Sequence, residues 1–355
     1  MRVVRGNWLA GVVAVALAGG LSGVGAAGAA TSAETAPSAA SEQAAQGWLV
    51  DSPEVGLGTA VPVDVSTAGT TTIAVGYARP DGVKQWQPLA LHREQGAWVN
   101  RAVPVPEGTS MARLHAVLTL SRTDAWAAGY AVVDGAMRPW IVHWDGTAWT
   151  TADTSQAADG ALYGISGDSG GVWAVGESDA GASVLRLVNG TWQQVTLPPD
   201  LQVNWFTGVS ARGANDLWVV GPENMSAHWN GHGWTKVPVP AVGGQAVWLE
   251  NVRTSALQGT WAVGYRVGEE GRTPTALRWD GQAWRQSELP LVKGQFDDIA
   301  FTADGPVAVG AADGAATPTG ERGYAVRLPS AGRPAREVSV PGAAKNLHGA
   351  AVGPA

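Results

Sequence analysis

The stretch from Trp126 to Trp149 reads WAAGYAVVDGAMRPWIVHWDGTAW, and it is one copy of a unit that recurs along most of the chain. Its first part is a short apolar run that ends in glycine. Six such runs occur, and their glycines are 53, 47, 45, 43 and 46 residues apart, at Gly76, Gly129, Gly176, Gly221, Gly264 and Gly310. A period of this length is typical of one blade of a β-propeller.

The second part of the unit places a basic residue six positions before a tryptophan. Most copies have Asp-Gly or Asn-Gly between the two, a pair that favours a tight hairpin turn. In the third copy Asn189-Gly190 is shifted by one residue, so its turn is expected to differ. With a short strand ahead of each glycine run, the period contains four strands. We therefore predict an all-β fold, a β-propeller of six four-stranded blades.

A residue that recurs in every blade is most simply explained by the packing of each blade. We apply this to the basic residues and expect those in the second and fourth copies to hydrogen-bond to Asp124 and Asp216. The recurring tryptophans are likewise interpreted as blade-packing groups. The basic residues are His92, His143, Arg186, His228, Arg278 and Arg327.

The two ends of the repeat region carry one more signal. Residues Gly47-Trp48-Leu49-Val50 resemble an isolated last strand of a blade, and Leu347-His348-Gly349-Ala350 resemble an isolated first strand. Together they predict a partial seventh blade that closes the ring with both termini. A plain six-bladed ring is the alternative.

The units Trp173-Ala174-Val175-Gly176 and His143-Trp144-Asp145-Gly146 resemble those of secreted bacterial β-propeller repeat proteins. The turn is also similar to the Asp-box of sialidase-type propellers, and the repeat to kelch-type propellers, although His or Arg stands where the Asp-box has serine. The resemblance covers residues 47–355 and implies a propeller. It implies no single activity, because such repeats occur in enzymes and in lectins.

The amino terminus has the pattern of an export signal. Arg2 and Arg5 precede an apolar stretch from Leu9 to about Val24, which small residues around Gly28 follow. Five glycines between Gly11 and Gly25 argue against a membrane anchor. We predict a signal peptide at residues 1–29, a disordered linker at 30–46 and the propeller at 47–355, in a secreted protein with no stable membrane insertion after cleavage.

The net charge and the lack of cysteine limit the classes of partner and cofactor that the protein can bind. Removing residues 1–29 takes away two arginines and no acid, leaving 21 basic against 30 acidic side chains. This negative field disfavours nucleic acid. With no cysteine, stability must come from the apolar core, and a galactose-oxidase-type copper site cannot be built. We expect no cofactor, no metal and a monomer.

One motif resembles a catalytic signature. Gly167-Asp168-Ser169-Gly170-Gly171 matches the nucleophile motif of chymotrypsin-like proteases. It falls between the first and second strands of the third repeat, and no helix follows it, as the nucleophile elbow of hydrolases requires. We interpret it as a plain turn.

Residues outside the repeat pattern are the candidates for function, because variable loops on a rigid scaffold commonly carry recognition. Four tryptophans have no repeat role: Trp86, Trp140, Trp205 and Trp248. They could form flat apolar platforms for a sugar ring or a protein, or merely cover the blade tops.

The second residue of each first strand is irregular and mostly polar, which predicts a ring at the channel mouth. Its members are His115, Tyr163, Thr207, Glu250, Asp297 and His348. Histidines with carboxylates could bind a metal or perform acid/base chemistry, although a solvated channel needs polar residues in any case. Asp297 and Asp298 are expected to point to opposite sides of the strand.

The sequence favours a non-catalytic protein that binds an extracellular carbohydrate or protein through its loop-rich face. The first alternative is a propeller enzyme, a glycoside hydrolase or lyase or a metal-dependent hydrolase, with its site at the channel mouth. The second alternative is a scaffold of the cell envelope.

Overall fold

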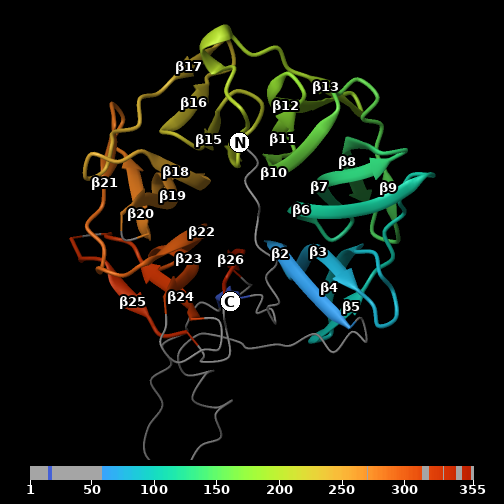
Figure 1. The fold of residues 1–355 in the computed structure, drawn as a ribbon, viewed down its shortest axis with the longest axis horizontal. Helices are drawn as coiled ribbons and strands as arrows, with labels where there is room; N and C mark the ends of the chain where they lie inside the picture. The colour runs from blue at the N-terminus through green and yellow to red at the C-terminus, as the bar shows by residue number, and fades with distance from the viewer. Residues whose placement is uncertain are drawn as a thin grey trace, which may run out of the picture.

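The computed structural model describes residues 15–17, 58–269, 271–313, 320–330, 332–340 and 346–352. They form six four-stranded antiparallel sheets whose strands follow one another in chain order. The prediction of an all-β propeller of six four-stranded blades is confirmed (Figure 1). The predicted signal peptide, except for residues 15–17, and the predicted linker lie outside these ranges.

The strands of the first three blades are β2 (Thr59–Ala68), β3 (Thr71–Arg79), β4 (Gln87–Glu94), β5 (Ala97–Asn100); β6 (Thr109–Ser121), β7 (Asp124–Val133), β8 (Ala136–Trp144), β9 (Trp149–Thr151); and β10 (Gly160–Asp168), β11 (Gly171–Ser178), β12 (Gly181–Val188), β13 (Thr191–Gln194). Those of the last three are β14 (Gly208–Ala211), β15 (Leu217–Gly221), β16 (Met225–Trp229), β17 (Trp234–Lys236); β18 (Val247–Ser255), β19 (Gly259–Gly268), β20 (Gly271–Trp279), β21 (Trp284–Gln286); and β22 (Gly294–Thr302), β23 (Gly305–Asp313), β24 (Glu321–Arg327), β25 (Arg336–Val338). A short 3-10 helix, η1 (Pro199–Leu201), joins the third blade to the fourth. Among the described residues, no helix is long and apolar enough to cross a membrane.

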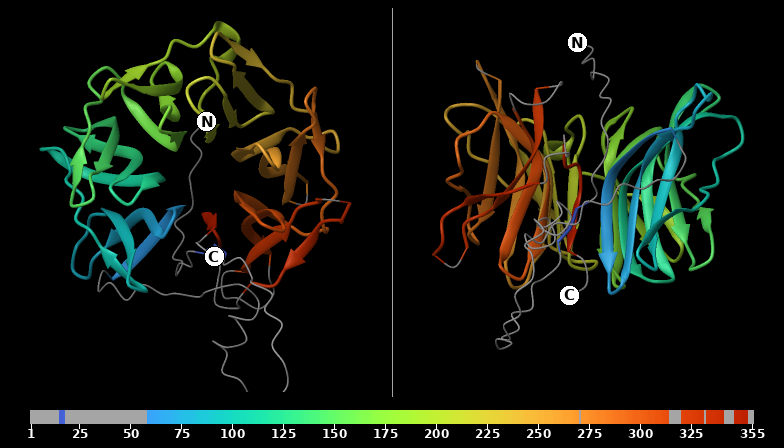
Figure 2. Two further views of the ribbon diagram at one scale, coloured as in Figure 1. Left: turned by 180° about the vertical axis from the view of Figure 1, so that it is seen from behind. Right: turned by 90° about the horizontal axis from the view of Figure 1, so that it is seen from below.

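The blades stand around a central channel, and the first strand of each blade is innermost (Figures 1 and 2). A further strand, β26 (Ala350–Val352), contacts both β22 and β2, so it occupies a seventh position between the last blade and the first. It pairs in parallel with β1 (Val15–Leu17). A carboxyl-terminal strand stands at the predicted position in the ring, but it covers Ala350–Val352 rather than the predicted Leu347–Ala350. Its predicted partner at residues 47–50 lies outside the described residues.

A β-bulge interrupts the innermost strand at the same place in five blades. In the first blade the register of the β2–β3 pairing shifts between Pro62 and Asp64. The register shifts at the equivalent point of the innermost strand in four further blades, in β6, β10, β18 and β22. The repeat glycine lies opposite the bulge. A Cβ atom on Gly129 would collide with the carbonyl oxygen of Arg113, and the glycines of the other blades meet an equivalent carbonyl. Glycine is needed here because the innermost strand approaches too closely for any side chain.

The recurring basic residue stands directly opposite the first residue of the apolar run on the neighbouring strand. The ring centre of His143 lies 4.2 Å from that of Trp126. In the third blade the Arg186 guanidinium lies 4.9 Å from the ring centre of Trp173. These are cross-strand pairs of a cationic or imidazole group on an indole face, which contribute to sheet stability.

Two of these histidines make the hydrogen bonds that the sequence predicts. His143 Nε2 lies 2.9 Å from Asp124 Oδ1, and His228 Nε2 lies 2.8 Å from Asp216 Oδ1. Asp124 is the first residue of β7 and Asp216 directly precedes β15, so each bond links the histidine to the start of the neighbouring strand. The structural interpretation of these two basic residues is confirmed.

The tryptophans of two outermost strands, β9 and β21, hydrogen-bond to the preceding blade. The indole N–H of Trp149 donates to His92 Nε2 of the first blade at 3.1 Å, and that of Trp284 donates to Ser226 Oγ of the fourth blade at 3.0 Å. His92 is 5 % exposed. Burial lowers its pKa to about 4, so its imidazole is neutral at pH 7 and accepts the indole hydrogen.

The hairpin turns follow the local sequence. Asp145 Oδ1 accepts hydrogen bonds from the backbone N–H groups of Thr147 and Ala148, at 2.8 and 2.9 Å. In the third blade Asn189 and Gly190 both have positive φ, at 50° and 83°, so this turn differs from those at Asp145, Asn230 and Asp280, as expected, and matches the turn at Gln95 in the first blade. The protease-like motif is also a turn, because Asp168 pairs with Gly171 at the hairpin between β10 and β11.

The neutral state of His92 predicts a pH-dependent stability. Its pKa is lower in the folded chain than in the unfolded one, so the unfolded state binds more protons between about pH 6.5 and 4, and stability falls as the pH decreases through that window. We expect the wild-type protein to lose on the order of 1–3 kcal/mol more than His92→Gln between pH 7 and pH 4.5. Urea unfolding at the two pH values measures this difference.

The glutamine keeps an acceptor for Trp149 and removes the titration, which makes it the matched control. A comparison with the variant is needed because burial raises the pKa of Asp64, and that carboxyl affects stability with the opposite sign. Equal losses in the two proteins would contradict the proposed role of His92.

Candidate functional site

The bulges determine which side chains enter the channel. The unpaired residue at each bulge lies within the innermost strand, and the equivalent residues of the fourth blade and of the seventh position complete the set. These are Val63, His115, Tyr163, Thr207, Glu250, Asp297 and His348. All seven line one cavity of about 980 Å³. A bulge redirects a side chain that regular pairing would place elsewhere, which explains why this ring can vary while the blades repeat.

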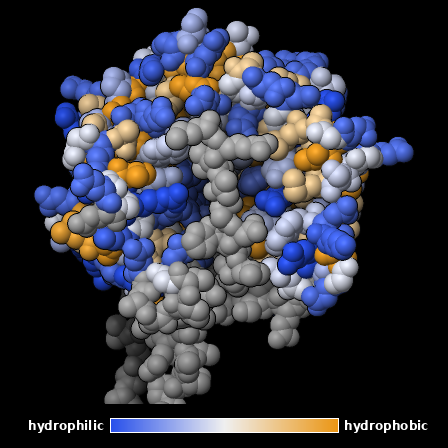
Figure 3. Space-filling view, viewed as in Figure 1, coloured by the Kyte–Doolittle hydropathy of each residue, from blue (hydrophilic) through white to orange (hydrophobic). Residues whose placement is uncertain are grey.

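The cavity lies on the axis of the ring, and hydrophilic residues border the visible part of the central hollow (Figure 3). Below the bulge residues, the cavity wall continues with Asp64, Asn251 and Asp298. The expectation that Asp297 and Asp298 point to opposite sides is wrong, because both line the cavity. The bulge between Phe296 and Asp298 breaks the alternation on which that expectation depended.

The four irregular tryptophans separate into different environments. Trp86 and Trp205 are partly exposed and line the cavity. Trp248 stands behind Trp205, with 6.3 Å between their ring centres, and does not line the cavity itself. Trp140 is 2 % exposed and packs in the core between the first and second blades, so it has no face to offer a ligand. We therefore leave Trp140 out of the candidate site.

Two aromatic groups flank the cavity. On the first blade the rings of Tyr77 and Trp86 meet edge to face with centres 5.1 Å apart. On the fourth and fifth blades Trp205 contacts Trp248, which stacks on Tyr265 with 6.2 Å between ring centres. Each group supports one partly exposed indole with a second aromatic ring, so the platform is held by packing.

Tyr77 and Tyr265 were not among the predicted site residues, although the sequence carries a signal for them. Both directly follow the repeat glycine, and so does Tyr130, which stacks on His115 with 5.6 Å between ring centres. In the third blade Glu177 holds this position, and its carboxylate accepts the hydroxyl hydrogen of Tyr163 at 2.5 Å. The residue after the glycine is therefore another irregular position that points to the channel end.

The sixth blade and the seventh position contribute an acidic wall. His348 Nδ1 lies 3.3 Å from Asp297 Oδ2. Burial lowers the pKa of His348, but the hydrogen bond and charge of Asp297 and the charge of Glu321 outweigh burial, so the pKa lies above its ordinary value. Burial and the charges of Asp297 and Asp313 raise the pKa of Glu321.

The floor of the cavity contains two carboxyl groups that serve the ring itself. Asp64 Oδ2 accepts the backbone N–H of Val117 in the next blade at 2.8 Å, and Asp298 Oδ2 accepts that of Ala350 in the seventh position, also at 2.8 Å. Burial and the charge of Asp298 raise the pKa of Asp64 to about 7, and burial raises the pKa of Asp298. Arg253 Nη2 lies 3.7 Å from Asp298 Oδ1 and partly offsets the negative charge.

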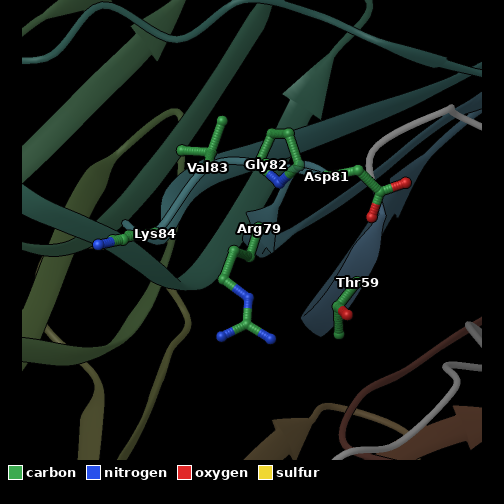
Figure 4. A pocket seen from close by; sticks show the side chains of 7 residues that line it. Thr59, Arg79, Asp81, Gly82, Val83 and Lys84 are labelled. Carbon is green, nitrogen blue, oxygen red and sulfur yellow. The ribbon is translucent and has the colours of Figure 1, made fainter.

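The described residues contain no group of three or more His, Asp or Glu side chains placed to hold a metal ion. A second, more open cavity of about 410 Å³ lies beside the loop between β3 and β4, where Arg79 points into the space between Thr59 and Lys84 (Figure 4). Thr59, Arg79 and this single loop form it, whereas the large cavity collects side chains from every position of the ring.

No protein-family model and no curated protein matches the sequence. Among solved structures, the chain is similar to YCF48 bound to a D1 peptide, at 15% identity and a TM-score of 0.49, over 74% of this chain and 78% of that one. It is also similar to a putative 6-phosphogluconolactonase from Bacteroides uniformis, at 11% identity and a TM-score of 0.49, over 76% and 81% of the two chains. A third is the extracellular domain of a putative hybrid two-component system of B. thetaiotaomicron, at 12% identity and 0.48, over 82% and 36%. Likenesses of this size do not transfer a function.

The pairing of His348 with Asp297 can be tested by titration. Because the folded pKa of His348 lies above the unfolded value, the pair stabilises the protein fully at low pH, and this contribution is lost as the pH rises through the folded pKa. We expect Asp297→Asn to make His348 titrate at a lower pH. NMR titration of the imidazole resonances measures this, with His348→Gln to assign the signal. An unchanged titration of His348 in the variant would contradict the pairing.

Proposed function

We propose that this chain is an exported, non-catalytic binding protein that takes an extracellular carbohydrate into the cavity at the channel mouth. The observation that carries the proposal is the position of two supported indoles, Trp86 and Trp205, on the wall of one polar cavity. A flat apolar ring beside polar hydrogen-bonding groups matches the two kinds of surface of a sugar.

The shape of the site favours a carbohydrate over a folded protein. Stable protein interfaces bury roughly 800 Å² on each partner over a broad, fairly flat area. Here the partly exposed aromatic rings line a concave cavity of about 980 Å³, the size range of small-ligand sites. Large apolar side chains that are strongly exposed elsewhere, such as Leu257 and Leu291, are isolated residues in different loops.

Two carboxyl groups of the cavity, Asp64 and Asp298, are engaged by the backbone, which supports a structural rather than a catalytic role for this pair. A hydrolase needs a pair of acids that are free to act on the substrate. Both oxygens of Asp64 accept backbone N–H groups, and both oxygens of Asp298 do so as well. Their raised pKa values are explained by a structural role at the blade junctions.

The export of the protein remains a proposal from the sequence. Its support is the order of basic residues, apolar stretch and small residues within residues 1–29. The turn at Asp145, whose carboxylate accepts two backbone N–H groups, supports the resemblance to the Asp-box of sialidase-type propellers. The resemblance concerns the conformation of this turn, and we propose no sialidase activity from it.

Replacing the indoles tests the proposed function. We expect Trp86→Ala and Trp205→Ala each to weaken binding of a carbohydrate identified on a glycan array by roughly tenfold or more, because each removes a contact face of the ligand. Isothermal titration calorimetry measures the affinities, and thermal unfolding verifies that each variant is folded.

Trp98→Ala is the matched control, because Trp98 is a partly buried tryptophan of the outer strand β5 that does not line the cavity. Its binding should equal that of the wild type. Absence of any carbohydrate ligand, or equal losses in all three variants, would count against the proposal. A protein partner captured through the same two tryptophans would reject the carbohydrate class.

Export has a structural consequence that can be measured. Cleavage after Ala29 removes β1, but the segment that ends in β26 keeps the Leu347 N–H bond to the Gly310 carbonyl at 3.2 Å and the Ala350 N–H bond to Asp298. We expect the exported protein to begin at residue 30. We expect its free energy of unfolding to lie within about 1 kcal/mol of the full chain, whereas deletion of residues 346–355 should cost about 3 kcal/mol or more.

Mass spectrometry of the exported chain and urea unfolding of the three forms give these values. An exported chain that retains residues 1–29, or a strong loss of stability on their removal, would oppose this account of the amino terminus.

A further inference from the structure

The wall of the cavity at the first and second blades concentrates positive charge on two aromatic rings. The guanidinium carbon of Arg113, on β6, lies 4.5 Å from the ring centre of Tyr77 and 5.8 Å from that of Trp86. The guanidinium of Arg79, at the end of β3, lies 5.2 Å from the ring centre of Trp86. All four residues line the large cavity. We call these four residues the arginine–aromatic wall.

Both arginines stand apart from the carboxylates of the described residues. Neither Arg79 nor Arg113 forms an ion pair with any carboxylate in the described part of the chain. Other arginines in the same residues are paired, as Arg101 is with Glu94 and Arg322 with Glu337. The Nε of Arg113 is buried without a hydrogen-bond partner. Two cations that share an aromatic support without a counter-ion repel each other, and an arriving anion relieves that repulsion.

Most acidic groups of the cavity stand on other blades, and the one on the first blade, Asp64, has both carboxylate oxygens bonded to backbone N–H groups. Asp297, Asp313 and Glu321 belong to the sixth blade, on the other side of the seventh position from the first blade (Figure 1). Aspartate and glutamate there repel an anion, whereas the arginine–aromatic wall attracts it. The charge distribution therefore sets the direction in which an anionic ligand lies in the cavity.

We propose that the carbohydrate of the proposed function is acidic, a uronate-type sugar whose ring carboxylate binds Arg113 and Arg79 while its ring lies on Trp86. This inference depends on the proposed function and specifies its ligand class. A guanidinium presents parallel N–H donors that match the two oxygens of a carboxylate. In a hexuronate the carboxylate is attached directly to the pyranose ring, so one residue places its anion and its apolar face within reach of adjacent groups on the wall.

The decisive probe pair is oligogalacturonate and its fully methyl-esterified form, which keep the same sugar ring and differ in the charge of the carboxyl group. We expect the wild-type protein to bind the acid at least tenfold more tightly than the ester by calorimetry. Arg113→Gln should remove most of that preference, and Arg79→Gln part of it. Both variants should reduce the dependence of the affinity on salt concentration, because fewer charges take part.

Arg285→Gln is the control, since Arg285 pairs with Asp280 beside the turn between β20 and β21 and does not line the cavity. It should bind like the wild type. Arg113→Lys keeps the charge without the paired donors and should restore only part of the preference. Thermal unfolding verifies the fold of each variant, and the ester affinity of Arg113→Gln should stay within about twofold of wild type if the loss is specific to the carboxylate.

The outcomes separate the two proposals. Equal binding of acid and ester through Trp86 would overturn the acidic ligand and leave the carbohydrate function in place. Preference for a sulfated neutral sugar over the uronate would likewise overturn the proposal that the recognised anion is a carboxylate. Failure to bind any member of a broad glycan panel, with or without charge, would overturn the proposed function and with it this inference.

Discussion

The close approach of the innermost strand to the repeat glycine is the constraint on which the rest of this structure depends. The carbonyl of Arg113 occupies the space where a Cβ on Gly129 would stand, and the other blades repeat the arrangement. This packing accommodates an additional residue in the innermost strand as a bulge, and the bulge turns that residue toward the channel. One steric requirement thus explains the period of the sequence and the composition of the cavity wall.

The ring is held together by side chains that bond to the backbone of the next blade. Asp64 serves this purpose between the first and second blades, and Asp298 between the sixth blade and the seventh position. At other junctions a serine hydroxyl accepts the backbone N–H of the next blade. Ser166 accepts that of Ala211, and Ser210 accepts that of Thr254. Burying a carboxyl is costly unless backbone donors satisfy it. Both aspartates meet that condition, and they remain buried at junctions where the chain has to close.

The residues that repeat in every blade and the residues that vary between blades have different roles. The basic residue of each blade is used within the sheet or at a blade junction, as the His143–Asp124 and His92–Trp149 hydrogen bonds show. The bulge residue lines the channel cavity, the residue after the glycine lines it or contacts the bulge residue in most blades, and both differ from blade to blade. Their differences give the cavity an aromatic, cationic side around Trp86 and an acidic side around Asp297. A symmetric scaffold therefore surrounds an asymmetric site.

Period, turns and blade number could be read from the amino-acid order, because they depend on local requirements: a glycine opposite a bulge, a residue pair suited to a tight turn, and apolar runs of strand length. The ring of channel residues followed from the same register. Three features depended on contacts between residues distant in sequence. Trp140 is buried because the first blade packs against the second. Asp298 joins Asp297 in the cavity because of the bulge, and Arg113 reaches the rings of Tyr77 and Trp86 because two blades meet there. Burial, bulge geometry and the assembly of charges across blades are properties of the packed ring, and no local pattern of residues encodes them.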